Sequence, residues 1–139
     1  MTKTFRHRQS LKVAVDFDGT IVEHQFPRIG KLMPGALAAL RMLQEAGCLL
    51  ILWTCREDGG GGNTDKVLTE AVEFMRGHGV EFRSINCNHP ADEFRHGGGR
   101  KIYADIYLDD RNLGGFPGWA AVVKEILGVD LMDEPAEAA

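Results

Sequence analysis

Residues 13–20 read Val-Ala-Val-Asp-Phe-Asp-Gly-Thr, an apolar run that leads into two aspartates and a glycine turn. A run of this kind predicts a buried β-strand, which we place at residues 12–17. A charged carboxylate inside the sheet would be unfavourable. We therefore expect Asp16 and Asp18 to project into the crevice at the carboxyl end of the strand, where open α/β sheets bind their ligands.

The spacing of the two aspartates predicts that their side chains share one side of the strand while Phe17 turns into the core. Two carboxylates this close raise each other's pKa unless a cation lies between them. Hard oxygen donors favour Mg²⁺ over Zn²⁺. Asp16 and Asp18 therefore predict a magnesium site.

An Asp-Xaa-Asp-Gly sequence can also be a capped turn or half of a calcium-binding loop. The apolar residues before Asp16 favour a strand over an isolated turn. The calcium loop is disfavoured because Ile21 stands where its glycine is needed, and Pro27 stands where its bidentate glutamate is needed.

Strand and helix signals alternate along the chain, which favours an α/β fold with a parallel sheet and helices on both faces. The predicted strands are residues 12–17, 49–53, 80–85 and 102–108, and the predicted helices are residues 34–47, 65–76 and 119–127. Apolar residues at helical spacing place Trp119 in the core. The glycine run at 59–62 lacks the lysine of a nucleotide loop, so we interpret it as a flexible linker.

Polar side chains follow three of the four predicted strands. They are Asp16 and Asp18 after the first strand, Thr54 after the second, and Asp109 and Asp110 after the last, with Lys101 just before the last strand. Because the carboxyl ends of parallel strands meet at one edge, we expect these groups to converge on one crevice. Arg56 could bind an anion there, but we interpret it as a surface residue.

Composition indicates an ordinary globular protein: 139 residues, of which 44% are hydrophobic and 26% are charged, suffice for one domain with a real core. We predict a basic N-terminal arm at 1–11, a single domain at 12–130 and a flexible acidic tail at 131–139. The net charge of -4 gives no general attraction to nucleic acid or to anionic membranes. No apolar run is long enough to cross a bilayer, and we expect a cytoplasmic protein.

The cysteines and histidines suggest no further metal site or disulfide framework. The three cysteines are odd in number and widely spaced, so neither a disulfide framework nor a zinc site is indicated. We expect Cys48 to be buried in a strand. His89 and His96 have no carboxylate at a fixed spacing, and we interpret them as exposed loop residues.

The order of these motifs resembles the four motifs of the haloacid dehalogenase (HAD) superfamily of phosphotransferases, over about residues 12–127. The resemblance implies a Rossmann-like, HAD-like fold in which Asp16 is the nucleophile and Asp18 is the general acid and base. It implies that Thr54 and Lys101 contact the phosphate and balance its charge. The magnesium site that it implies consists of Asp16, Asp18, Asp109 and Asp110.

An acid at position 18 resembles the phosphatases and phosphomutases of this superfamily. Relatives that cleave carbon–halogen bonds, or that keep a long-lived aspartyl phosphate, tend to lack this acid. The connections 20–33 and 86–100 are too short for a cap domain. Capless members resemble either enzymes that act on large substrates or homo-oligomers in which a neighbouring subunit serves as the lid. Phe26, Arg28 and the two glycine-rich loops are the local candidates for substrate contact.

The leading hypothesis is a Mg²⁺-dependent phosphomonoester hydrolase that acts through an aspartyl phosphate. Its phosphorylated substrate could be a sugar phosphate, a nucleotide, a nucleic-acid end or a phosphoprotein. The alternative is a non-catalytic, receiver-like phosphoacceptor or phosphate-binding signalling module. That alternative is disfavoured because its phosphorylated aspartate ends a middle strand, where this chain has Thr54.

Overall fold

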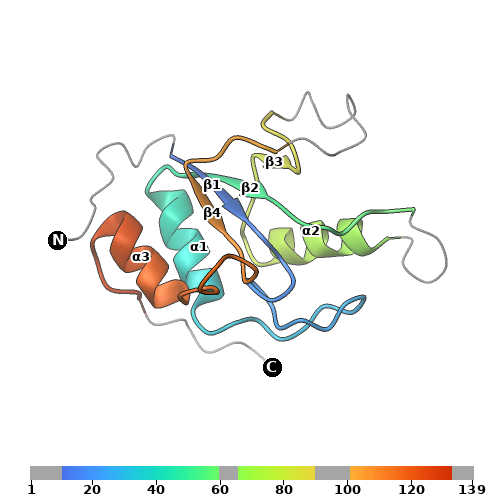
Figure 1. Cartoon of the computed structure of the whole chain (residues 1–139), viewed down its shortest axis with the longest axis horizontal. Coiled ribbons are helices and arrows are strands. Elements are labelled where there is room, and N and C mark those ends of the chain that lie inside the picture. The colour runs from blue at the N-terminus through green and yellow to red at the C-terminus, as the bar shows by residue number, and fades with distance from the viewer. Residues whose placement is uncertain (1–10, 60–65, 90–100, 133–139) are drawn as a thin grey trace.

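The computed structural model describes residues 11–59, 66–89 and 101–132. Residues outside the described ranges include most of the predicted N-terminal arm, most of the predicted acidic tail, His96 and much of the glycine run. Within the described ranges the chain forms an α/β fold of Rossmann-like type, as the sequence predicts (Figure 1).

The sheet is parallel throughout, with the strand order β3-β2-β1-β4. Its strands are β1 (Lys12–Val15), β2 (Leu49–Leu52), β3 (Ser84–Ile85) and β4 (Ile106–Leu108). The middle strand β1 pairs Val15 with Leu52 on one side and with Leu108 on the other. This register brings the chain segments that follow β1, β2 and β4 to the same edge of the sheet.

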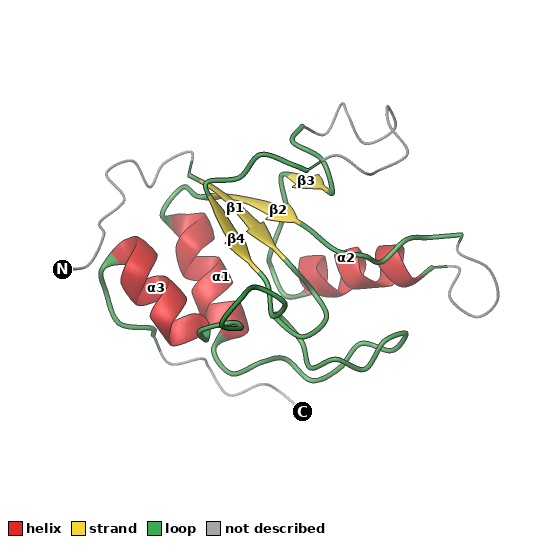
Figure 2. Ribbon diagram, in the orientation of Figure 1, coloured by secondary structure: helices red, strands yellow, loops and turns green. Residues whose placement is uncertain are grey.

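The helices are α1 (Ala36–Glu45), α2 (Val67–Gly77) and α3 (Trp119–Leu127) (Figure 2). The boundaries of α3 match the predicted helix at 119–127. Helix α2 begins two residues later than predicted, and its cap comes from outside the helix: the Asp58 carboxylate accepts hydrogen bonds from the N–H groups of Leu68 and Thr69. A carboxylate at this position satisfies amides that have no partner within the helix.

The prediction of helices on both faces is wrong for the described part of the chain, where all three helices cover the same face. Residues of α1, α2 and α3 join one core with Val13, Val15 and Leu52. The steps from β1 to β2 and from β2 to β3 run in the same direction across the sheet. Right-handed connections therefore place α1 and α2 on the same face.

The opposite face is covered by extended chain just before β4. Ile102 and Ala104 pack there against Ala14 and Ile51, and the Tyr107 hydroxyl hydrogen-bonds to the Ile102 carbonyl. Because residues 101–105 follow this route, β4 begins at Ile106 and is shorter than the predicted strand at 102–108.

The connection from β1 to α1 contains isolated bridges and turns rather than a domain, in agreement with the predicted absence of a cap at this point. A bridge joins Val22 to Leu32, and the Glu23 N–H donates to the Lys31 carbonyl over 2.7 Å. Residues 23–31 thus form a narrow loop whose two ends are hydrogen-bonded to each other; we call this loop the excursion at residues 23–31. The excursion closes beside the carboxyl end of the sheet.

Other predictions can be compared directly with the structure. Trp119 and Cys48 are buried, as predicted, although Cys48 lies just before β2 and not within a strand. None of the three cysteines forms a disulfide. His89 is exposed, as predicted. In the described ranges, no helix has the length and apolar character needed to cross a membrane.

Candidate active site

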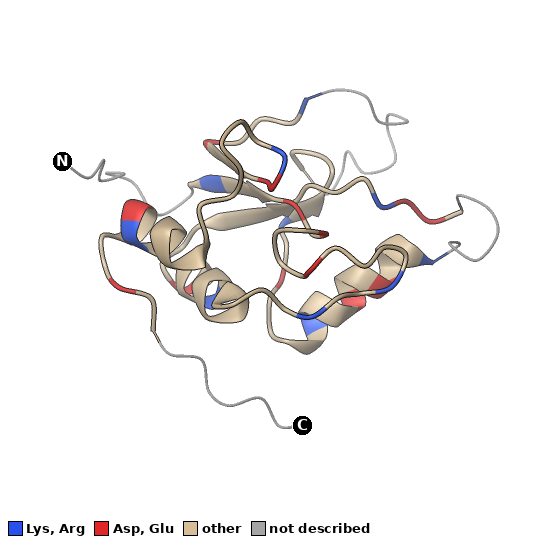
Figure 3. Ribbon diagram, turned by 60° about the horizontal axis from the view of Figure 1, so that its bottom comes forward, with Lys and Arg blue, Asp and Glu red and all other residues tan. Residues whose placement is uncertain are grey.

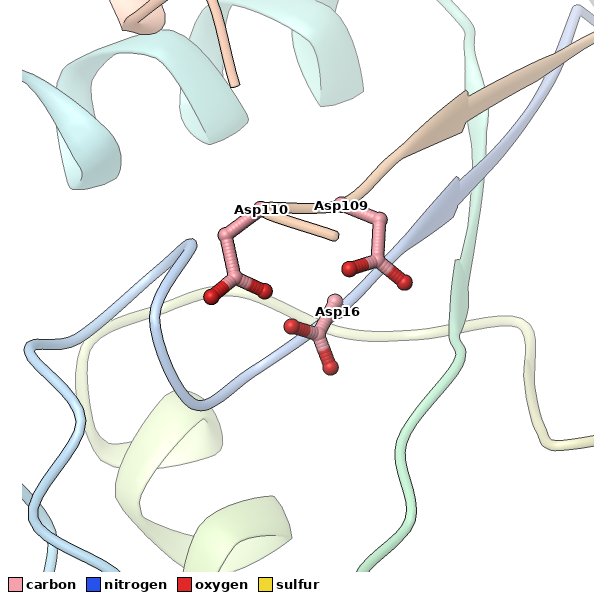
Figure 4. Close-up of side chains that lie close together, drawn as sticks. All are labelled: Asp16, Asp109 and Asp110. Atoms are coloured by element: carbon pink, nitrogen blue, oxygen red, sulfur yellow. The ribbon is translucent and has the colours of Figure 1, made fainter. Parts of the chain in front are cut away.

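Three aspartates converge at the carboxyl edge of the sheet. Asp16 follows β1, and Asp109 and Asp110 follow the neighbouring strand β4 (Figure 4). Each offers a carboxylate oxygen, and these three atoms lie within 4.8 Å of one another. The Asp16 N–H donates to the Leu108 carbonyl over 2.9 Å, so the two strands remain paired up to the site itself. The predicted convergence of Asp16 with Asp109 and Asp110 is confirmed.

The crowding of these carboxylates changes their electrostatics. The pKa of Asp16 is raised to about 7, first because the group is partly buried and then because the Asp109 and Asp110 carboxylates lie beside it. A divalent cation among the three groups would offset both effects. Three half-buried oxygen donors fit a hard cation such as Mg²⁺ better than Zn²⁺, which favours nitrogen and sulfur ligands.

Thr20 links the two halves of the cluster. Its buried hydroxyl donates to Asp16 Oδ2 over 3.2 Å and accepts a hydrogen bond from the Asp110 N–H over 3.0 Å. The Trp119 indole N–H in turn donates to the Thr20 carbonyl over 2.9 Å. Thr20 is therefore a positioning residue that the motif contains but that the sequence analysis does not assign to the site.

Gly19 is required by the close approach of Asp110. Its φ of +88° lies in the left-handed region, and a Cβ atom added to it would collide with the Asp110 carboxylate. Any other residue at this position would push the acid out of the cluster.

Asp18 lies outside this cluster. Its carboxylate instead forms a bidentate ion pair with Arg56, with Nε to Oδ2 at 2.7 Å and Nη2 to Oδ1 at 2.8 Å. The strand ends at Val15, and Asp18 belongs to the turn that bridges to Val22. The alternation of side chains along a strand therefore does not extend to Asp18, although Phe17 is buried in the core as predicted.

The interpretation of Arg56 as a surface residue is wrong. Its side chain is only 1% exposed, whereas that of Asp18 is 12% exposed. The central guanidinium carbon lies over the rings of Phe17 and Phe26, at 5.0 and 5.2 Å from their centroids. A lone arginine after Thr-Cys gives no sequence signal of this burial, because its partners come from distant segments.

Thr54 lies at the same edge of the sheet. The Trp53 N–H donates to the Val15 carbonyl, which places Thr54 beside the turn after β1. The Thr54 N–H donates to Asn86 Oδ1 over 2.8 Å, and its hydroxyl accepts a hydrogen bond from the Arg56 N–H over 3.1 Å. Asn86 is a second residue that the sequence analysis does not identify.

Lys101 is exposed, and its ammonium lies 5.1 Å from the centroid of the Tyr107 ring. Tyr107 pairs with Ala14, two residues before Asp16. The structure thus places the Lys101 ammonium near the Tyr107 ring, on the sheet face that α1, α2 and α3 leave uncovered.

The two loop residues proposed for substrate contact lie beside Arg56. The Phe26 side chain is 45% exposed, and the Arg28 carbonyl accepts a hydrogen bond from Arg56 Nη2 over 3.1 Å. Figure 3 shows where acidic and basic residues lie along the described chain.

Comparisons with known proteins identify a solved structure that is similar to this chain. No protein-family model matches the chain, and no curated protein matches it. Among solved structures, the chain is similar to a conserved protein from Bacteroides thetaiotaomicron, with 43% identity and a TM-score of 0.71. The similarity covers 84% of this chain and 88% of that one.

Proposed function

The chain belongs to the same family as the conserved Bacteroides thetaiotaomicron protein, and from its site we propose that it is a Mg²⁺-dependent phosphomonoester hydrolase of the HAD superfamily. The observation that carries this proposal is the convergence of Asp16, Asp109 and Asp110 within 4.8 Å at the carboxyl edge of a parallel sheet. The order of the motifs along the chain supports the same assignment.

Asp16 is the proposed nucleophile. One of its carboxylate oxygens attacks phosphorus, the ester P–O bond breaks, and an aspartyl phosphate forms. Thr20 orients this carboxylate through its hydrogen bond to Oδ2. Mg²⁺, when bound by the three carboxylates, would neutralise charge on the phosphoryl group.

Asp18 is the proposed general acid and base. It protonates the leaving alkoxide in the first step and removes a proton from the water that hydrolyses the aspartyl phosphate in the second. The products are an alcohol and inorganic phosphate, and both aspartates return to their starting states. Thr54 and Lys101 are the proposed partners of the phosphate oxygens.

The substrate is a phosphorylated molecule, and the short β1–α1 connection supports an open site that admits a large one. The cysteines, which form no disulfide, suit the reducing cytoplasm, where we propose that the protein acts.

The proposal is tested by assaying hydrolysis of p-nitrophenyl phosphate with Mg²⁺, with a chelator, and in Asp16→Asn. We expect Mg²⁺-dependent turnover that the chelator and the substitution both abolish. Asp130→Asn is the matched control, because it removes the same charge from a side chain that is 95% exposed and paired with Lys124. Turnover that survives in Asp16→Asn would contradict the proposal, and stoichiometric phosphorylation without turnover would indicate a phosphoacceptor instead.

A further inference from the structure

The Arg56 guanidinium uses every hydrogen-bond donor that it has. An arginine side chain carries five N–H groups, and here two of them donate to the Asp18 carboxylate. The other three donate to the carbonyls of Pro27, Arg28 and Val67, at 3.3, 3.1 and 3.0 Å. The group therefore has no donor left for a substrate phosphate.

The consequence falls on Asp18, because both of its oxygens accept a hydrogen bond from the same cation. Each carboxyl oxygen has two lone pairs, so the oxygen that gives its proton to a leaving alcohol is also one that Arg56 holds in place. The pair therefore lies directly on the route of the proton.

We propose that Arg56 is a positioning residue for acid–base chemistry: it holds the Asp18 carboxylate and governs its delivery of a proton to the leaving group. This inference rests on the proposed function. Arg56 acts through Asp18 and does not contact the substrate.

The surroundings explain why an arginine serves here and a lysine does not. The guanidinium bridges three segments, namely the turn after β1, the excursion at residues 23–31 and the start of α2. A lysine has a compact ammonium with three donors and cannot form the planar fork. Arg56→Lys therefore keeps a buried positive charge but loses the geometry that fixes both Asp18 oxygens.

The test uses leaving groups that differ in their need for a proton. A p-nitrophenolate leaves without protonation, whereas the alkoxide of an alkyl phosphate such as glycerol phosphate needs the general acid. Both substrates are assayed with the wild type, Arg56→Lys, Asp18→Asn and the double variant. The measured quantity is kcat/KM, because it includes departure of the leaving group but not hydrolysis of the aspartyl phosphate.

We expect Arg56→Lys to lower kcat/KM about 100-fold for the alkyl phosphate, with a loss at least about tenfold smaller for the aryl phosphate. The double variant should be no slower on the alkyl phosphate than Asp18→Asn alone, because both changes act on one proton transfer. Arg41→Lys is the control: Arg41 also donates two hydrogen bonds, to the His78 carbonyl, away from the site. It should change neither substrate's kinetics.

Equal losses on both substrates, or losses that add in the double variant, would overturn the role of Arg56 and leave the proposed function standing. A wild type that hydrolyses neither phosphate would overturn the proposed function, and this inference with it. Thermal melts and Mg²⁺ titrations of each variant show that the kinetic comparison is made between folded proteins with an intact acidic cluster.

Discussion

Asp16 and Asp18 are two residues apart in the chain but lie in opposite electrostatic environments. Asp16 has two further carboxylates beside it, and its pKa is raised to about 7. Asp18 has a buried guanidinium that satisfies both of its oxygens. One aspartate thus needs a cation from solution, whereas the other has a cation supplied by the chain. Such a division of environments allows neighbouring acids to take different roles.

The largest difference between the two aspartates is expected in turnover. Asp16→Asn removes the proposed nucleophile and should lower kcat/KM for p-nitrophenyl phosphate by at least about 10⁴-fold. Asp18→Asn removes a proton carrier and should lower kcat about 100-fold through slower hydrolysis of the aspartyl phosphate. Steady-state kinetics at saturating Mg²⁺ measure both effects. If the fold loss in kcat/KM of Asp16→Asn were no larger than the fold loss in kcat of Asp18→Asn, the distinction between the two aspartates would be wrong.

The next largest difference is expected in stability. Arg56→Ala leaves the Asp18 carboxylate without its cation and three carbonyls without their donor, so we expect it to lower the free energy of unfolding by about 3–5 kcal/mol. Asp109→Asn, which relieves repulsion in the acidic cluster, should leave the metal-free protein at least as stable as the wild type. Urea unfolding at pH 7.5 without Mg²⁺ compares the two variants. A stable Arg56→Ala protein would contradict the structural role of the ion pair.

Stability should also depend on pH through Asp16. Because its pKa is higher in the folded state than its ordinary value of 3.8, the folded protein holds the proton more tightly than the unfolded chain. Its contribution is complete at pH values below about 4 and is lost as the pH rises through about 7. Melting temperatures of the metal-free protein from pH 5 to 8 should therefore fall more steeply in the wild type than in Asp16→Asn.

Added Mg²⁺ should reverse that loss, because the cation competes with the proton for the same carboxylate. The rise in melting temperature on adding Mg²⁺ is expected to be larger at pH 8 than at pH 6. A rise that is independent of pH would show that Asp16 does not bind the ion.

The smallest effect is expected at Trp119, which reaches the site only through Thr20. Trp119→Phe keeps an aromatic ring in the core but loses the hydrogen bond to the Thr20 carbonyl. We expect Trp119→Phe to lower the free energy of unfolding by about 1 kcal/mol. It should also weaken Mg²⁺ binding more than Val123→Ala does, which is a control on the same helix. Calorimetric Mg²⁺ titration measures the difference.

The acidic cluster could be predicted because its position follows from local patterns. Apolar runs locate β1 and β4, parallel strands align their carboxyl ends, and Asp16, Asp109 and Asp110 are the residues that follow. The roles proposed for Thr54 and Lys101 stay predictions. The face covered by the helices was not predictable in the same way, because apolar periodicity does not contain the strand order.

Arg56 was missed because its environment is assembled from segments far apart in the chain. Its partners lie up to 38 residues away, and no spacing rule connects Arg56 with the Pro27 and Arg28 carbonyls. The cap of α2 was missed for a similar reason. Asp58 lies ten residues before Leu68, whereas sequence rules look for a capping residue immediately before the helix.

The excursion at residues 23–31 has a consequence for how this protein could acquire new parts. The hydrogen bond between Glu23 and Lys31 brings its two ends together, and adjacent ends at the surface are where a chain accepts an inserted segment. However, the loop tip also supplies the Pro27 and Arg28 carbonyls to Arg56. If a lid segment were inserted between Glu23 and Lys31, the hydrogen bonds from Arg56 to the loop carbonyls would have to be replaced. We therefore expect the identity of residue 56 and the length of this loop to change together during evolution.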